Sequence, residues 1–159
     1  SLIAQDMTWA VTINPLDSNS YYYKGMANFV LSEKEGAPKL IECINDLTQF
    51  IKLQPDNFVA HYIRGQASFF LGSSGQDGDG GEDNAGKYFV ATAADMDECL
   101  RLDPNNPECL FYRCMSYLII GDFAGVVKDA TVLGKIDAKD KTEAPRKGFI
   151  FKRKDKSKK

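Results

Sequence analysis

The chain has 159 residues, of which 43% are hydrophobic and 26% are charged, and its formal net charge at pH 7 is −2. This length suits one domain with a continuous core, and no apolar run approaches the roughly 20 residues that a membrane-spanning helix needs. The chain opens without a signal-peptide pattern, so we expect a soluble protein of the cytoplasm, with the nucleus as the alternative. The range 145–159 sums to +7 and the remaining residues to −9, which predicts an acidic body with a basic tail.

Apolar residues at three- and four-residue spacing predict six helices, near 18–31, 39–53, 58–71, 87–102, 107–120 and 123–135. Residues 1–14 have the pattern of a second helix whose partner is missing, so we expect the chain to begin within a longer array. Turn-forming residues at 32–38 and a glycine-rich acidic segment at 72–86 are expected to be insertions, the second one disordered. From 138 to 159 we expect a basic disordered tail, and the alternative for 136–144 is a short capping helix.

The region from Asp103 to Val127 shows the organisation of the chain most clearly. Leu110, Cys114 and Tyr117 share one helix face, and a Gly-Asp turn at 121–122 separates this helix from the next. Prolines that end a helix recur at positions 15, 55 and 104, at intervals of 40 and 49 residues. This helix–turn–helix unit resembles the tetratricopeptide repeat, whose period is 34 residues. The repeats would span 18–54, 58–103 and 107–137, with the surplus residues inserted in the first two.

Charged residues recur in the same frame and locate the insertions between the two helices of a unit. A cation occupies position 7 of each first helix, and an aspartate occupies position 23 in each second helix. These residues are Lys24, Arg64 and Arg113, and Asp46, Asp95 and Asp129. We expect each cation to contact an aspartate across the helix pair as a structural ion pair, with Arg113 contacting Asp129 or the aspartate of the preceding repeat. The alternative is that these cations bind an anionic partner.

The resemblance implies an all-α fold, a right-handed superhelix of antiparallel helix pairs, in which the first helices line a concave groove. The groove positions of the family fall on residues that are largely aromatic or apolar. They are Asn19, Tyr22, Met26, Phe29, Val59, Tyr62, Gln66, Phe69, Glu108, Phe111, Met115 and Leu118. The implied function is a protein-interaction scaffold that holds an apolar or helical segment of a partner protein. The alternative is that a flanking helix or the segment 148–151 fills the groove.

Chaperone-binding members of the family hold a terminal carboxylate with lysine, arginine and asparagine, and this chain lacks that set. The corresponding positions hold Tyr22, Met26, Ile63, Glu108 and Tyr112. We therefore expect no recognition of an EEVD-type chaperone tail.

No catalytic, metal or cofactor site is expected from the residue pattern. The four cysteines, at 43, 99, 109 and 114, form no C-x-x-C pair and take positions suited to small buried residues. His61 is the only histidine and takes a helix-packing position. Acidic residues at 77–83 do not match the ligand spacing of a calcium loop. The prediction is therefore a protein that is not an enzyme.

The basic tail leaves other functions open. Arg146–Lys159 holds eight basic residues, which would suit nucleic acid, anionic lipid, a nuclear-import receptor or a solvated end. The competing hypotheses are therefore a module in which the tail binds nucleic acid or an anionic membrane, and the docking arm of a larger enzyme.

Overall fold

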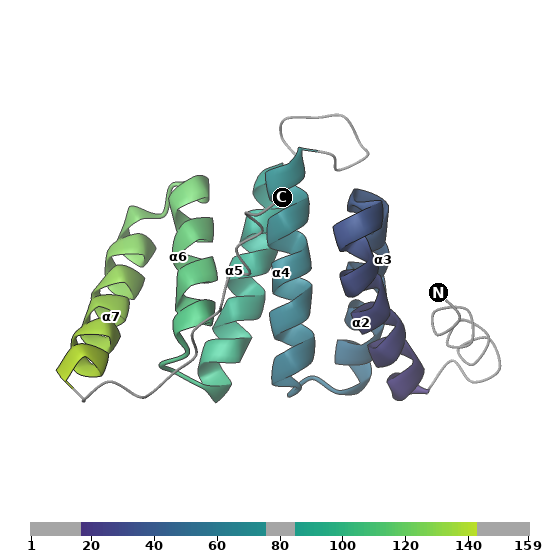
Figure 1. Ribbon diagram of the computed structural model, residues 1–159, viewed down its shortest axis with the longest axis horizontal. Coiled ribbons are helices and arrows are strands. Elements are labelled where there is room, and N and C mark those ends of the chain that lie inside the picture. Colours follow the sequence, from purple (N-terminus) through teal and green to yellow (C-terminus); the bar gives the residue numbers. More distant parts are fainter. Residues whose placement is uncertain (1–16, 76–84, 143–159) are drawn as a thin grey trace, which may run out of the picture.

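A computed structural model describes residues 17–75 and 85–142, and within these ranges the regular structure is entirely α-helical. The expected all-α class is thereby confirmed. Figure 1 shows the helices in chain order from α2 and α3, which overlap at the right, to α7 at the left, with the chain turning alternately at the upper and lower edges of the row. The elements are α2 (Ser18–Glu35), α3 (Ala37–Leu53), α4 (Phe58–Ser74), α5 (Ala85–Leu102), α6 (Pro107–Ile120) and α7 (Phe123–Thr142).

Local residues account for where several helices begin and end. Asn57 and Asn106 are N-caps, and their side chains accept hydrogen bonds from the backbone N–H groups of Ala60 and Cys109. Pro107 occupies the first turn of α6, where it removes a backbone donor that would have no helical partner. Gly121 ends α6 with a φ of +83°, a left-handed conformation that glycine adopts without steric cost.

The helices are longer than the sequence pattern predicted at three places. The expected insertion at 32–38 is not a loop, because α2 continues to Glu35 and α3 begins at Ala37, with Gly36 alone between them at a φ of +74°. Glutamate and lysine in this segment are good helix formers, so the surplus residues lengthen the helices. Likewise α4 and α5 take in both ends of the segment 72–86, and α7 continues through 138–142, so the helical alternative holds there and the tail does not begin at 138. Residues 1–16, 76–84 and 143–159, with the expected half repeat and most of the tail, lie outside the described ranges.

The core follows the row of helices in two clusters of buried side chains. The first lies among α2, α3 and α4, around Leu40, Leu47 and Leu71. The second lies among α5, α6 and α7, around Met96 and Leu110. The helices thus pack against their neighbours in the chain, as a row of packed helices requires.

The cysteines belong to this packing. Cys43, Cys99 and Cys109 are buried, Cys114 is half-buried, and all four are free thiols. Burial raises the pKa of the Cys43 thiol to about 12, so it stays protonated and unreactive at neutral pH. Their expected role in core packing is confirmed.

None of the helices described in these ranges is both long enough and apolar enough to cross a membrane.

Candidate functional site

Helices α2, α4 and α6 share one face of the molecule. Each packs on its neighbours in the chain, and in addition α2 contacts α4 and α4 contacts α6. The side chains that these three helices present together therefore come from three separate parts of the sequence. We call this surface the α2–α4–α6 face.

The twelve residues expected to line a groove all lie on these helices, and none of them is buried. Five are exposed, namely Asn19, Val59, Glu108, Phe111 and Leu118, and the other seven are half-buried. Two of the half-buried group pack mainly inward: the ring of Tyr22 lies 5.0 Å from that of Phe50, and the ring of Phe69 lies 5.5 Å from that of Phe89.

A depression of about 460 Å³ lies between α4 and the start of α6. We call it the Glu108 depression; its lining comprises Tyr62, Gln66, Pro107, Glu108, Phe111, Tyr112 and Leu133. Its volume is within the range of small-molecule sites, although it is an open surface feature. Four of its members are expected groove residues, so the structure brings this part of the expected set together.

Hydrogen bonds join the polar members of this depression. The Tyr62 hydroxyl donates to a carboxylate oxygen of Glu108, and Gln66 Nε2 lies 3.0 Å from the Tyr62 hydroxyl and 3.1 Å from the Tyr112 hydroxyl. Burial, followed by the bond to Glu108, raises the pKa of Tyr62, so its hydroxyl stays protonated and remains a donor. The network orients the rings of α4 and α6 relative to each other.

A second depression, also of about 460 Å³, lies on the α2 side of Gln66. We call it the Glu33 depression; its lining comprises Phe29, Ser32, Glu33, Leu40, Gln66 and Phe70. Gln66 lines both depressions, so the two are neighbours on the same face. Each one combines exposed aromatic surface with one glutamate.

Aromatic rings connect the two depressions, with Tyr112 at their centre. Its ring centroid lies 5.2 Å from that of Phe69, 5.7 Å from Phe111, 6.3 Å from Tyr62 and 6.4 Å from Phe70, and all four pairs meet edge to face. Such pairs are favourable beyond the area that they bury. The rings therefore form a preorganised surface.

The lining residues of these depressions that sequence reasoning missed are Ser32, Glu33, Leu40, Phe70, Pro107, Tyr112 and Leu133. Phe70 and Tyr112 directly follow the expected residues Phe69 and Phe111, so a strict one-face periodicity excluded them. A helix that packs on two neighbours has an apolar stripe wider than a single line of residues. Two consecutive aromatic residues in the sequence are the signal that could have identified Phe70 and Tyr112.

The three expected ion pairs are in contact, each between the two helices of one pair. Lys24 Nζ lies 3.0 Å from Asp46 Oδ1. Arg64 donates to both oxygens of Asp95 at 2.7 and 2.9 Å, and Arg113 donates to both oxygens of Asp129 at 2.6 and 2.8 Å. All three aspartates are buried. These contacts fit the structural interpretation, because the cations face buried carboxylates.

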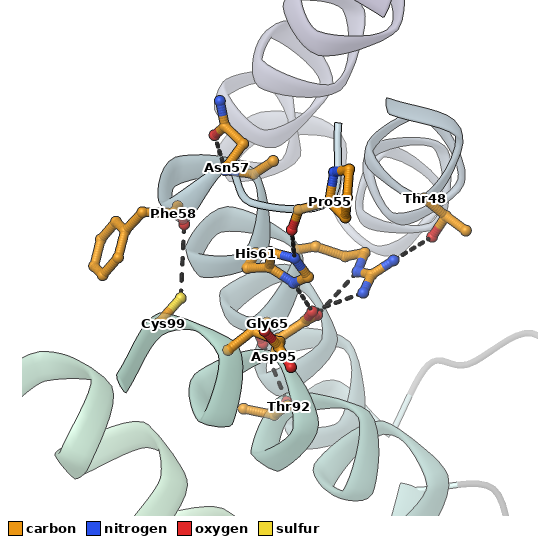
Figure 2. Close-up of polar contacts among 12 residues, drawn as sticks. Thr48, Pro55, Asn57, Phe58, His61, Gly65, Thr92, Asp95 and Cys99 are labelled. Atoms are coloured by element: carbon orange, nitrogen blue, oxygen red, sulfur yellow. Dashed lines mark hydrogen bonds and ion pairs between the residues drawn. The ribbon is translucent and has the colours of Figure 1, made fainter. Parts of the chain in front are cut away.

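His61 completes a polar cluster around Asp95, which Figure 2 shows. His61 Nδ1 lies 2.8 Å from Asp95 Oδ1, and Nε2 lies 2.8 Å from the carbonyl oxygen of Pro55. Both partners accept hydrogen bonds, so only the doubly protonated ring satisfies both. The bond to Asp95, against the opposing effect of burial, raises the pKa of His61. Both ring nitrogens are therefore engaged in holding α4 to its neighbours, which agrees with the expected core histidine.

In the ranges 17–75 and 85–142, no three His, Cys, Asp or Glu side chains gather in a way that could hold a metal ion. The acidic insertion at 76–84 lies outside these ranges.

Comparison with known proteins adds no assignment: the chain matches no protein-family model, no curated protein and no solved structure.

Proposed function

We propose that the chain is a protein-interaction scaffold that binds an apolar or helical segment of a partner protein on the α2–α4–α6 face. In this proposal the helix pairs form a right-handed superhelix of the tetratricopeptide-repeat type, and this face is its concave side. The protein then acts by holding its partner and needs no catalytic group of its own.

The observation that carries the proposal is the aromatic surface shared by the two depressions. Phe111 is 51% exposed and Phe70 is 43% exposed, and both lie against ordered neighbouring rings. Leaving large rings in water is unfavourable, and contiguous surfaces of this kind mark interaction sites. Rings already held by their neighbours lose little entropy on binding, which favours affinity.

Two further features support a peptide or helix as the ligand. Met26 and Met115 are half-buried on this face, and the flexible methionine side chain adapts to partners of different shape. Exposed glutamates beside the rings supply hydrogen-bond acceptors that would orient a bound segment. The face carries no carboxylate clamp of the chaperone type, so an internal segment suits it better than a chain terminus.

The proposal is tested by selecting ligands with the full-length chain as bait, from a displayed peptide library and from a native lysate. The affinity of each ligand is then measured for the wild type and for Tyr62→Ala/Phe111→Ala. Loss of a central aromatic anchor typically costs about 2 kcal/mol, so Kd should rise roughly thirtyfold.

The matched control is Phe123→Ala. Phe123 is an equally large exposed ring, but it lies on α7, away from the face. This variant should bind the same ligands as tightly as the wild type. Circular dichroism verifies that each variant folds. Ligands that bind the double variant and the wild type equally well would refute the proposal.

A further inference from the structure

On the α2–α4–α6 face, each of the two largely apolar depressions contains an acidic side chain. Glu108 and Glu33 each line one of the two depressions. The cations of the three helices are Lys24, Arg64, Arg113 and the protonated His61, each paired with a buried aspartate, and the exposed Lys34 near the end of α2. A ligand that complements this surface therefore carries aromatic or aliphatic side chains flanked by positive charge.

The chain itself contains such a segment. Residues 146–154 read RKGFIFKRK, three consecutive large apolar residues between two basic and three basic residues. We propose that this segment of the same molecule occupies the Glu108 depression, with Phe149 and Phe151 against Phe111 and Tyr112. The proposal rests on the proposed function of the face and names its first occupant. A partner would then have to displace the tail.

The connection between helix and depression is long enough. Helix α7 ends at Thr142 at the lower edge of the row in Figure 1, the edge at which α6 begins with Pro107. Leu133 of α7 lines the depression, and the nine residues from Leu133 to Thr142 span roughly 14 Å along a helix. The seven residues from Thr142 to Phe149 reach up to about 24 Å when extended. The segment can therefore return to the depression with length to spare.

Tethering makes this contact effective even where the contact itself is weak. A segment joined by a short linker competes at an effective concentration in the millimolar range. Because the attraction is partly between charges near the surface, added salt should weaken it. Occupancy by the tail would thus raise the threshold for partners and select those that bind the rings more tightly.

Photo-crosslinking in the full-length chain tests the proposal. The photoreactive residue p-benzoylphenylalanine replaces Phe149, and crosslinked peptides are mapped by mass spectrometry in the monomer fraction. We expect crosslinks within one molecule to the segment 107–112 or to Tyr62. The yield should fall severalfold in Glu108→Gln and in Phe111→Ala, and also at about 1 M salt. Phe123→Ala, the matched control, should leave the yield unchanged.

Three results would overturn the proposal. They are crosslinks mapped to other surfaces, a yield insensitive to Glu108→Gln and Phe111→Ala, and crosslinks that form only between molecules, which would make a second copy the occupant.

The second readout is partner affinity: Phe149→Ala/Phe151→Ala should bind any ligand of the face severalfold more tightly than the wild type.

The two proposals fail in distinguishable ways, because the crosslink requires no partner. Crosslinking at the depression without any ligand that depends on Tyr62 and Phe111 would uphold the tail contact and refute the scaffold function. Ligands whose binding depends on these rings, together with crosslinks to other surfaces, would uphold the scaffold function and refute the tail contact.

Discussion

Replacing Arg113 with methionine should reveal how strongly the buried ion pairs constrain this fold. Arg113 donates two hydrogen bonds, of 2.6 and 2.8 Å, to Asp129, which is only 1% exposed. The hydrogen bonds to Asp129 raise the pKa of Arg113, so the arginine carries its charge at every accessible pH. Methionine keeps the apolar stem but leaves the Asp129 carboxylate buried without these two bonds.

The expected loss in the free energy of unfolding is about 3–5 kcal/mol, because an uncompensated buried charge is costly. That is a large share of the roughly 5–15 kcal/mol by which domains are stable. Chemical denaturation followed by circular dichroism measures the loss. Arg113→Met/Asp129→Leu removes both charges, and this double variant should recover to within about 1–2 kcal/mol of the wild type.

Arg101→Met is the matched control. Arg101 also contacts two carboxylates, those of Glu98 and Asp56, but its side chain is 51% exposed. Solvent screens such pairs, so this change should leave stability essentially unaltered. The reasoning is wrong if Arg113→Met and Arg101→Met are equally stable, or if the double variant is as unstable as Arg113→Met.

Two further predictions concern the helix pairs. In Gly25→Ala the new Cβ would lie 2.8 Å from the Leu47 side chain, so the free energy of unfolding should fall by about 1–2 kcal/mol. Gly134 has open space around it, so Gly134→Ala should raise the free energy of unfolding by about 0.5–1 kcal/mol. Equal shifts in the melting temperatures of the two variants would contradict this prediction. The raised pKa of His61 means that its contribution to stability is complete below about pH 6.5 and is lost as pH rises through the folded-state pKa. His61→Gln should remove this pH dependence of stability, and NMR titration of the only histidine ring should show its raised pKa. If the stabilities of the wild type and His61→Gln change in parallel with pH near neutrality, the prediction is wrong.

Much of the fold could be predicted from the sequence because its determinants are local. Asn57 and Asn106 cap the helices that follow them, and the apolar spacing identified the six helices of the described ranges. The contacts of Arg64 with Asp95 and of Arg113 with Asp129 were also predictable. The cations and aspartates recur at corresponding positions of the helix pairs, so the same helix packing brings each cation to its aspartate.

The limits of an inserted segment were less predictable. The residues at 32–35 could form either a loop or another turn of helix, and their composition did not distinguish the two. The packing of α2 on α3 favours the helix, with Gly36 as the only connection. The aromatic part of the candidate site also depended on tertiary packing, because Tyr112 of α6 reaches the three rings of α4 only where the two helices lie side by side.

Helix α7 shows most directly what only the tertiary structure decided. Phe123 and Val127 correspond, counted from the paired aspartate, to Phe89 and Ala93 of α5, and the apolar pattern of the two helices is alike. Yet Phe89 and Ala93 are buried, whereas Phe123 is 67% and Val127 is 66% exposed. Phe89 lies within α5, which begins at Ala85, and packs on Phe69 of α4 with ring centroids 5.5 Å apart, whereas Phe123 is the first residue of α7, directly after the turn at 121–122. Periodicity establishes which side of a helix is apolar; burial depends on whether another helix lies against that side.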